Sequence, residues 1–147
     1  MNSNVSKTTI ASVFLRNGGE GEHTKLFENL SEPIQGDLRE KAILREDEEP
    51  VVAYNENGGD WCLITTQRFI WSKLGQTKNL EFRQLKDATI DSSLAIQHKA
   101  TSAADLRDLK LITNTNEEIS IEIEPGFPFS GIWNALKFLS TRNPATG

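Results

Sequence analysis

The sequence predicts an α+β protein that is mainly β, with about seven short antiparallel strands followed by one C-terminal helix. After Pro50, short runs rich in β-branched and aromatic residues alternate with turn residues. Ile119, Ile121 and Ile123 alternate with polar residues, as in an antiparallel strand with one solvated face. Over 129–139, apolar residues recur at three- and four-residue steps, the period of an amphipathic helix.

Length and composition are those of one globular domain. The chain has 147 residues, of which 37% are hydrophobic and 25% charged, so it can bury a core without disulfides or metal. Sixteen Lys and Arg against 21 Asp and Glu leave a net charge of −5. Proteins dedicated to nucleic acid carry a basic surface, so we expect no nucleic-acid partner. The single cysteine excludes an internal disulfide.

The first 42 residues are interpreted as an N-terminal extension, partly disordered and then helical. Residues 1–9 are polar and are expected to be disordered. The apolar stretch Ile10–Leu15 fits a strand or one helical turn, because it is too short for its period to decide. The glycine-rich stretch 17–21 indicates a mobile loop.

A short amphipathic helix is predicted over 33–44. Three apolar residues fall four positions apart on one face there: Ile34, Leu38 and Ala42. The acidic run 46–49 follows and is interpreted as a solvated connection, because like charges repel when packed together. Residues 43–143 are then expected to form the main domain, with 144–147 as a tail.

Seven segments have the composition of strands. They are residues 51–54, 61–65, 69–71, 80–82, 88–90, 109–113 and 119–123. Residues 55–60 and 73–76 have the composition of hairpin turns, and 92–104 is interpreted as a long connection. The strands follow one another with short turns, which favours antiparallel pairing.

The last element is predicted to be a helix that packs on the sheet. Its apolar stripe consists of Phe129, Ile132, Trp133, Leu136 and Leu139. Pro128 and Ser130 supply helix-start signals. Arg142 is expected near the negative end of the helix dipole, with Pro144 beyond the helix. A helix of this kind can plug the open end of a strongly bent antiparallel sheet.

Seven strands closed by a C-terminal helix with a buried tryptophan resemble the pleckstrin-homology (PH) superfold. The stretch Glu48–Val52, a glycine-containing loop and then 61–71 (WCLITTQRFIW) are similar to its bacterial PH and GRAM-type branch. Residues 84–90 (QLKDATI) resemble the strand that follows, and Trp133 is similar to the tryptophan of the closing helix. The resemblance covers residues 43–141 and implies a PH-like barrel capped by the helix.

PH-type domains bind phosphoinositide headgroups or protein surfaces, and few are catalytic, so the resemblance implies a binding module. Lipid-binding members place several Lys or Arg around the first hairpin, but here the loop 55–60 contains no base. The candidate ligand-binding cations lie on the next two hairpins: Arg68, Lys73, Lys78 and Arg83. Two alternatives stay open. Arg68 could pair with a nearby carboxylate or pack on Trp71, and the four together could be scattered, solvated charges.

No catalytic or metal-binding pattern stands out. His23 and His98 lie in polar loops, and Cys62 lies within a strand rather than at a helix N-terminus or beside a base, where a nucleophilic thiol is activated. Nucleophile-elbow, P-loop and dinucleotide-binding motifs are absent from the sequence. One cysteine and two distant histidines do not suit a metal site. We therefore expect no enzyme, no cofactor and no metal.

The favoured function is a non-enzymatic module that recognises a protein partner. Small size and a net charge of −5 suggest a sharper version, an acidic inhibitor of a basic enzyme such as an immunity protein. The alternative is a peripheral membrane module that binds anionic lipid or phosphoinositide headgroups. No signal-peptide pattern and no apolar run of about 18 residues is present, so a cytoplasmic location is expected. The oligomeric state is left open.

Overall fold

The structure is a computed structural model that describes residues 5–56, 59–97, 99–100 and 102–141. The helices and strands are α1 (Lys7–Arg16), β1 (Thr24–Leu26), α2 (Glu32–Ala42), β2 (Pro50–Asn55), β3 (Trp61–Thr65), β4 (Arg68–Lys73), β5 (Gln76–Glu81), β6 (Leu85–Ile90), α3 (Ser92–Gln97), β7 (Asp108–Thr113), β8 (Glu118–Glu122) and α4 (Phe127–Thr141). Single 3₁₀ turns cover Phe27–Asn29, Phe82–Gln84 and Ala103–Asp105.

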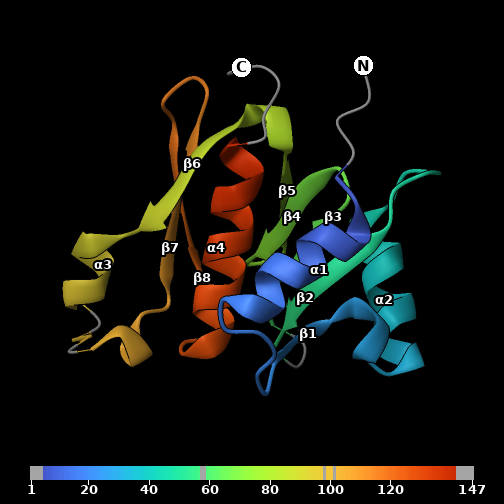
Figure 1. Ribbon diagram of the computed structural model, residues 1–147, viewed down its shortest axis with the longest axis horizontal. Helices are drawn as coiled ribbons and strands as arrows, with labels where there is room; N and C mark the ends of the chain where they lie inside the picture. The colour runs from blue at the N-terminus through green and yellow to red at the C-terminus, as the bar shows by residue number, and fades with distance from the viewer. Residues whose placement is uncertain (1–4, 57–58, 98, 101, 142–147) are drawn as a thin grey trace.

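The strands of the described ranges form two antiparallel sheets (Figure 1). One contains β1-β2-β3-β4-β5 in that order, and the other contains β6-β7-β8. The predicted α+β architecture is confirmed, since each of β2 to β8 overlaps one predicted segment and α4 follows them. Strands β5 and β6 begin earlier than predicted, at Gln76 and Leu85. The extra strand β1 comes from the N-terminal extension, where Lys25 pairs with Ala53. Within the described residues the two sheets do not close into one barrel, so β5 and β8 are each an outer strand.

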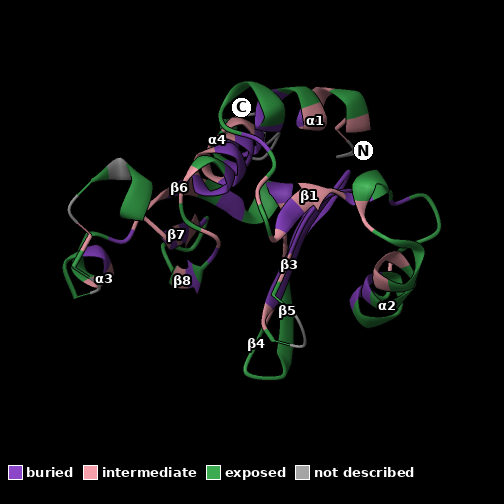
Figure 2. Ribbon diagram, turned by 90° about the horizontal axis from the view of Figure 1, so that it is seen from below, coloured by how far each residue is buried: buried purple, intermediate pink, exposed green. Residues whose placement is uncertain are grey.

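Helix α2 covers the outer face of the five-stranded sheet, on the side away from α4 (Figure 2). The predicted helix is confirmed, and its Leu38 and Ala42 are buried in a cluster with Ala53, Leu63 and Ile70 of the sheet. Strands β2, β3 and β4 are therefore covered on both faces. This burial explains why they are continuous apolar runs and not alternating ones.

The main core lies between the two sheets and is filled by α4. The predicted apolar stripe of this helix is confirmed: Phe129, Ile132, Leu136 and Leu139 are buried. Trp133 is partly buried, and its indole N–H donates to the carbonyl oxygen of Ala88 on β6 at 2.9 Å. The helix is thereby fixed to the three-stranded sheet. Arg142 and Pro144 lie outside the described residues.

The apolar stretch at residues 10–15 belongs to a helix, α1, which packs across α4. It begins at Lys7, so the disorder expected for residues 1–9 is wrong for residues 7–9, and residues 1–4 lie outside the described residues. A polar first turn is compatible with a helix here because the Ser6 hydroxyl accepts the Thr9 amide at 3.4 Å. Ile10 and Phe14 are buried in the main core, so the N-terminal extension supplies part of it.

The glycine-rich stretch 17–21 is a loop, as predicted, and it is packed against α4. A Cβ atom on Gly18, whose φ is +143°, would lie 2.1 Å from the carbonyl oxygen of Phe127. The Glu124 carboxylate also accepts the amides of Glu22 and His23, each at 2.9 Å. Glycine is needed at position 18 because the two backbones approach closely. Composition by itself does not distinguish a glycine required for close approach from a glycine in a mobile loop.

The long connection expected over 92–104 carries helix α3 and one 3₁₀ turn. The Asp91 carboxylate accepts the Leu94 amide at 3.1 Å and the hydroxyl of Ser120 on β8. The Ser120 hydrogen bond, followed by the Leu94 amide, lowers the pKa of Asp91. The connection is thus attached to the edge strand of the smaller sheet.

Candidate functional site

The four candidate cations do not form one basic patch, and Arg68 is not on the surface. Its side chain is 9% exposed, and that of Glu48 is fully buried. The Arg68 Nε donates to Glu48 Oε2 at 2.8 Å, and a terminal guanidinium nitrogen donates to Oε1 at 3.0 Å. The same guanidinium donates to the carbonyl oxygen of Ile43 at 3.1 Å. Arg68 is therefore committed to an internal ion pair, one of the alternatives that the sequence left open.

Glu48 overturns the interpretation of residues 46–49 as a wholly solvated run. Besides Arg68, its carboxylate accepts the Thr65 hydroxyl at 2.5 Å and the Arg45 amide at 3.0 Å. Burial by itself raises the pKa of Glu48, but these hydrogen bonds and the charge of Arg68 outweigh burial and lower it. The pair joins the connection before β2 to the β3–β4 turn, so its role is structural.

Arg83 is separated from the two lysines by its place in the fold. It lies in the 3₁₀ turn after β5 and is 61% exposed. Its guanidinium is 3.8 Å from the Glu81 carboxylate, which also lies 3.6 Å from Arg45. Such an exposed pair contributes little stability, and it leaves Arg83 partly neutralised.

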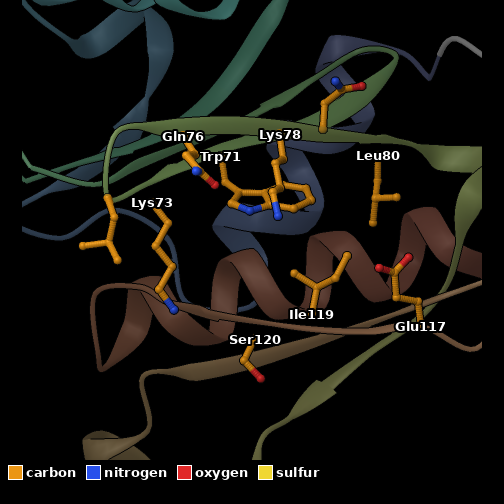
Figure 3. Close-up of a pocket in the computed structure, with 10 residues that line it drawn as sticks. Trp71, Lys73, Gln76, Lys78, Leu80, Glu117, Ile119 and Ser120 are labelled. Carbon is orange, nitrogen blue, oxygen red and sulfur yellow. The ribbon is translucent and has the colours of Figure 1, made fainter.

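Lys73 and Lys78 share a groove between the two sheets (Figure 3). The groove has a volume of about 650 Å³. We call it the inter-sheet groove and define it by six of its lining residues: Trp71, Lys73, Lys78, Leu80, Glu117 and Ile119. It lies between β4 and β5 on one side and β8 with its preceding turn on the other.

The walls of the inter-sheet groove combine apolar and charged groups. Trp71 and Leu80 lie on the β4–β5 side, and Ile119 faces them from β8 (Figure 3). Lys73 and Lys78 are exposed, and neither forms a salt bridge within the described part of the chain. The groove therefore offers two unpaired positive charges and one carboxylate, Glu117, beside the half-buried side chains of Leu80 and Ile119. Its net positive charge and apolar surface suit a ligand that has both apolar and anionic groups.

The hairpin tip at the end of the groove breaks a local rule of turn chemistry. Leu74 and Gly75 form the two-residue loop between β4 and β5, with φ of +52° and +81°. Positive φ at both positions is typical of a type I′ turn, in which the first position favours Asn or Asp and disfavours bulky residues. The Asp60 carboxylate accepts the Leu74 amide at 3.0 Å. The Leu74 side chain is 87% exposed, so packing does not account for it.

The residues considered for catalysis are poorly placed to react. Cys62 is buried in β3, and burial raises the pKa of its thiol to about 12, so the reactive thiolate is scarce at neutral pH. His23 is half-buried and lies near Glu124, and His98 lies outside the described residues. In the described ranges, His, Cys, Asp and Glu side chains do not gather in threes as a metal site requires. No described helix combines the length and apolarity needed to cross a membrane.

Comparison with known proteins adds no relative: no family model, curated protein or solved structure gives a significant match to this chain. The site is therefore defined by its geometry. Sequence reasoning identified Lys73 and Lys78 but missed their partners in the groove, Trp71 and Ile119, because these come from different sheets. It also missed Leu74, although a leucine before glycine in a two-residue hairpin loop is a detectable signal.

Proposed function

We propose that this chain is a non-enzymatic module that binds a protein partner in the inter-sheet groove. The observation that carries the proposal is the position of the groove between two outer strands, β5 and β8. An outer strand offers unpaired backbone groups, and proteins commonly recognise extended segments by adding a strand there. We also propose that the two sheets and α4 are a PH-like arrangement, which is consistent with the placement of Trp133 against β6.

The geometry favours a protein partner over a lipid headgroup. A phosphorylated inositol needs several charge-assisted hydrogen bonds. Arg68 is engaged with Glu48, Arg83 lies beside Glu81, and the described part of the first hairpin loop has no base. Two lysines remain, beside the half-buried apolar side chains of Leu80 and Ile119, which a headgroup would leave unused. The peripheral membrane alternative is therefore the weaker of the two.

The charge of the groove also bears on the inhibitor version of the proposal. An immunity-type inhibitor of a basic enzyme binds through an acidic surface, whereas Lys73 and Lys78 would repel a basic segment. An adaptor that holds an acidic or neutral segment fits the groove better. If the chain does act as an acidic inhibitor, another face must carry that activity.

Affinity capture with matched variants tests the proposal. A tagged chain is incubated with extract of its source cell at physiological salt, and bound proteins are identified by mass spectrometry. The groove variant Lys73→Glu/Lys78→Glu is compared with the control Lys25→Glu/Lys99→Glu, which makes the same charge change outside the groove. We expect one stoichiometric partner that the wild type and the control retain and the groove variant loses. Equal retention by all three would overturn the proposal.

A further inference from the structure

We propose that the segment bound in the inter-sheet groove is extended and acidic, and that it adds to β5 as a new strand. This inference rests on the proposed function and names the partner's chemistry. Strand β5 spans six residues, Gln76–Glu81, or about 20 Å at a rise of about 3.3–3.4 Å per residue. A partner segment of five or six residues would cover it.

The backbone of β5 presents unpaired groups on the side away from β4. Lys73 and Gln76 face each other across the two-residue loop, and the pair that closes such a loop is hydrogen-bonded. Every second residue from Gln76 therefore turns its amide and carbonyl toward β4, whereas Thr77 and Asn79 turn theirs outward. Glu81 belongs to the outward set, since its amide donates to a glutamine side chain at 2.9 Å. In the described ranges no strand pairs with β5 on that side.

The two lysines outnumber the one lining carboxylate, Glu117, so charge favours an acidic segment at this edge. Lys78 lies in the middle of β5, directly opposite Trp71 of β4, and Lys73 lies at the end of the neighbouring strand. Figure 3 shows Lys73 reaching from the β4 side toward β8. A second copy of β5 would bring another Lys78 to the same edge, and like charges placed opposite each other destabilise a strand pair. The lysines thus oppose self-association and favour carboxylate side chains.

Leu74 supplies an apolar contact at one end of the groove. Its positive φ acts against stability and its exposed side chain gains nothing from packing, so Asn at this position would suit the turn better. Residues that break local rules without a structural gain are concentrated at functional sites. We assign Leu74 to contact with an apolar side chain of the bound segment.

Defined peptides test the inference without knowledge of the natural partner. The probes are ten-residue capped peptides, one of alternating Glu and Val and one of alternating Lys and Val. A third repeats the Glu–Val sequence with every amide N-methylated, which removes the N–H donors from both edges and blocks strand pairing. We expect the Glu–Val peptide alone to bind, and binding to slow amide hydrogen exchange at Thr77 and Asn79 by at least about tenfold. Binding should weaken about tenfold in Lys73→Glu/Lys78→Glu and be unchanged in Lys25→Glu/Lys99→Glu.

Two further variants separate binding from folding. Thr77→Pro removes one outward amide and leaves the β4 ladder intact, so it should abolish peptide binding in a folded protein. Leu74→Asn should raise the melting temperature and still weaken binding, a combination that misfolding cannot produce.

Three results would overturn the inference. In the first, the Glu–Val and N-methylated peptides bind equally well. In the second, the protein binds anionic phospholipid vesicles more tightly than any peptide. In the third, the protein forms a dimer that dissociates in Thr77→Pro. Failure with peptides while partner capture still depends on Lys73 and Lys78 would overturn this inference and leave the proposed function standing. If the Lys73→Glu/Lys78→Glu variant captured the partner as well as the wild type does, the proposed function itself would be overturned.

Discussion

Replacement of Glu48 by Gln tests whether the Glu48–Arg68 pair is a buried structural ion pair. The two side chains are 0% and 9% exposed, so Glu48→Gln leaves the Arg68 guanidinium buried without its counter-charge. Removal of one member of a buried pair costs about 3–5 kcal/mol, against about 0–1 kcal/mol for an exposed pair. We expect Glu48→Gln to lower the free energy of unfolding at pH 7 by about 3–5 kcal/mol, measured by urea denaturation.

The same pair predicts a pH dependence with a definite sign. The folded-state pKa of Glu48 lies below its ordinary value of 4.5. The unfolded chain therefore takes up the proton first as the pH falls, and the carboxylate's contribution to stability is complete above about pH 5.5. It is lost as the pH drops through the folded-state pKa. The difference in unfolding free energy between wild type and Glu48→Gln should accordingly shrink as the pH falls below about 4.5.

A double-mutant cycle and a surface pair provide the controls. Arg68→Met leaves Glu48 unpaired and should cost a similar amount, whereas the double variant should cost much less than the sum of the two. Asp37→Asn breaks the exposed pair with Lys41, whose side chains are 54% and 45% exposed, and should cost at most about 0.5 kcal/mol. The reasoning fails if Glu48→Gln costs under about 1 kcal/mol and its effect does not change with pH.

Three other predictions follow from particular contacts. A Cβ on Gly131 would lie 2.7 Å from the buried ring of Phe14, so Gly131→Ala should lower the free energy of unfolding by about 1–3 kcal/mol. A Cβ on Gly36 would meet nothing within 4 Å, so Gly36→Ala should raise the free energy of unfolding by about 0.5–1 kcal/mol. If the two alanine variants changed that free energy equally, the close contact between Gly131 and Phe14 would be refuted. Ile43 has φ +52° and is 79% exposed. Ile43→Gly should therefore raise the melting point, and raise the unfolding free energy by about 1 kcal/mol. A lower unfolding free energy would show that the backbone at Ile43 is not strained. Cys62 should resist iodoacetamide at pH 8 until urea unfolds the chain, and rapid labelling of the folded protein would contradict its burial.

The N-terminal extension packs into both buried clusters, so the experiments depend on its presence. Helix α1 contributes Ile10 and Phe14 to the main core, and α2 buries Leu38 on the outer face of the five-stranded sheet. Truncation before residue 43 would expose the outer face of β2, β3 and β4. Binding experiments therefore need the full chain.

Patterns that act over a few residues were sufficient to predict most of the helices and strands. The helix stripe from Phe129 to Leu139 and the alternation at Ile119 and Ile121 are local, because each depends on which face of one element is buried. The structure has a helix and a strand there. The same holds for α2, where Leu38 and Ala42 recur at helical spacing. The α+β class and the type and order of α2, β2 to β8 and α4 could thus be read from the sequence, whereas α1 was left undecided and β1 and α3 were not predicted.

The contacts between helices, strands and loops that are distant in sequence were decided only by the tertiary structure. In sequence, Glu48 belongs to a run expected to be solvated, and the partner of Arg68 is left open. The two become a buried pair because the chain before β2 folds over the β3–β4 turn. The stretch around Gly18 looks flexible and is instead pressed against the carbonyl of Phe127, more than 100 residues away. The inter-sheet groove exists because β5 and β8 end their sheets opposite each other. Burial, close approach and sheet edges depend on contacts between distant segments, and local residue patterns carry no information about those contacts.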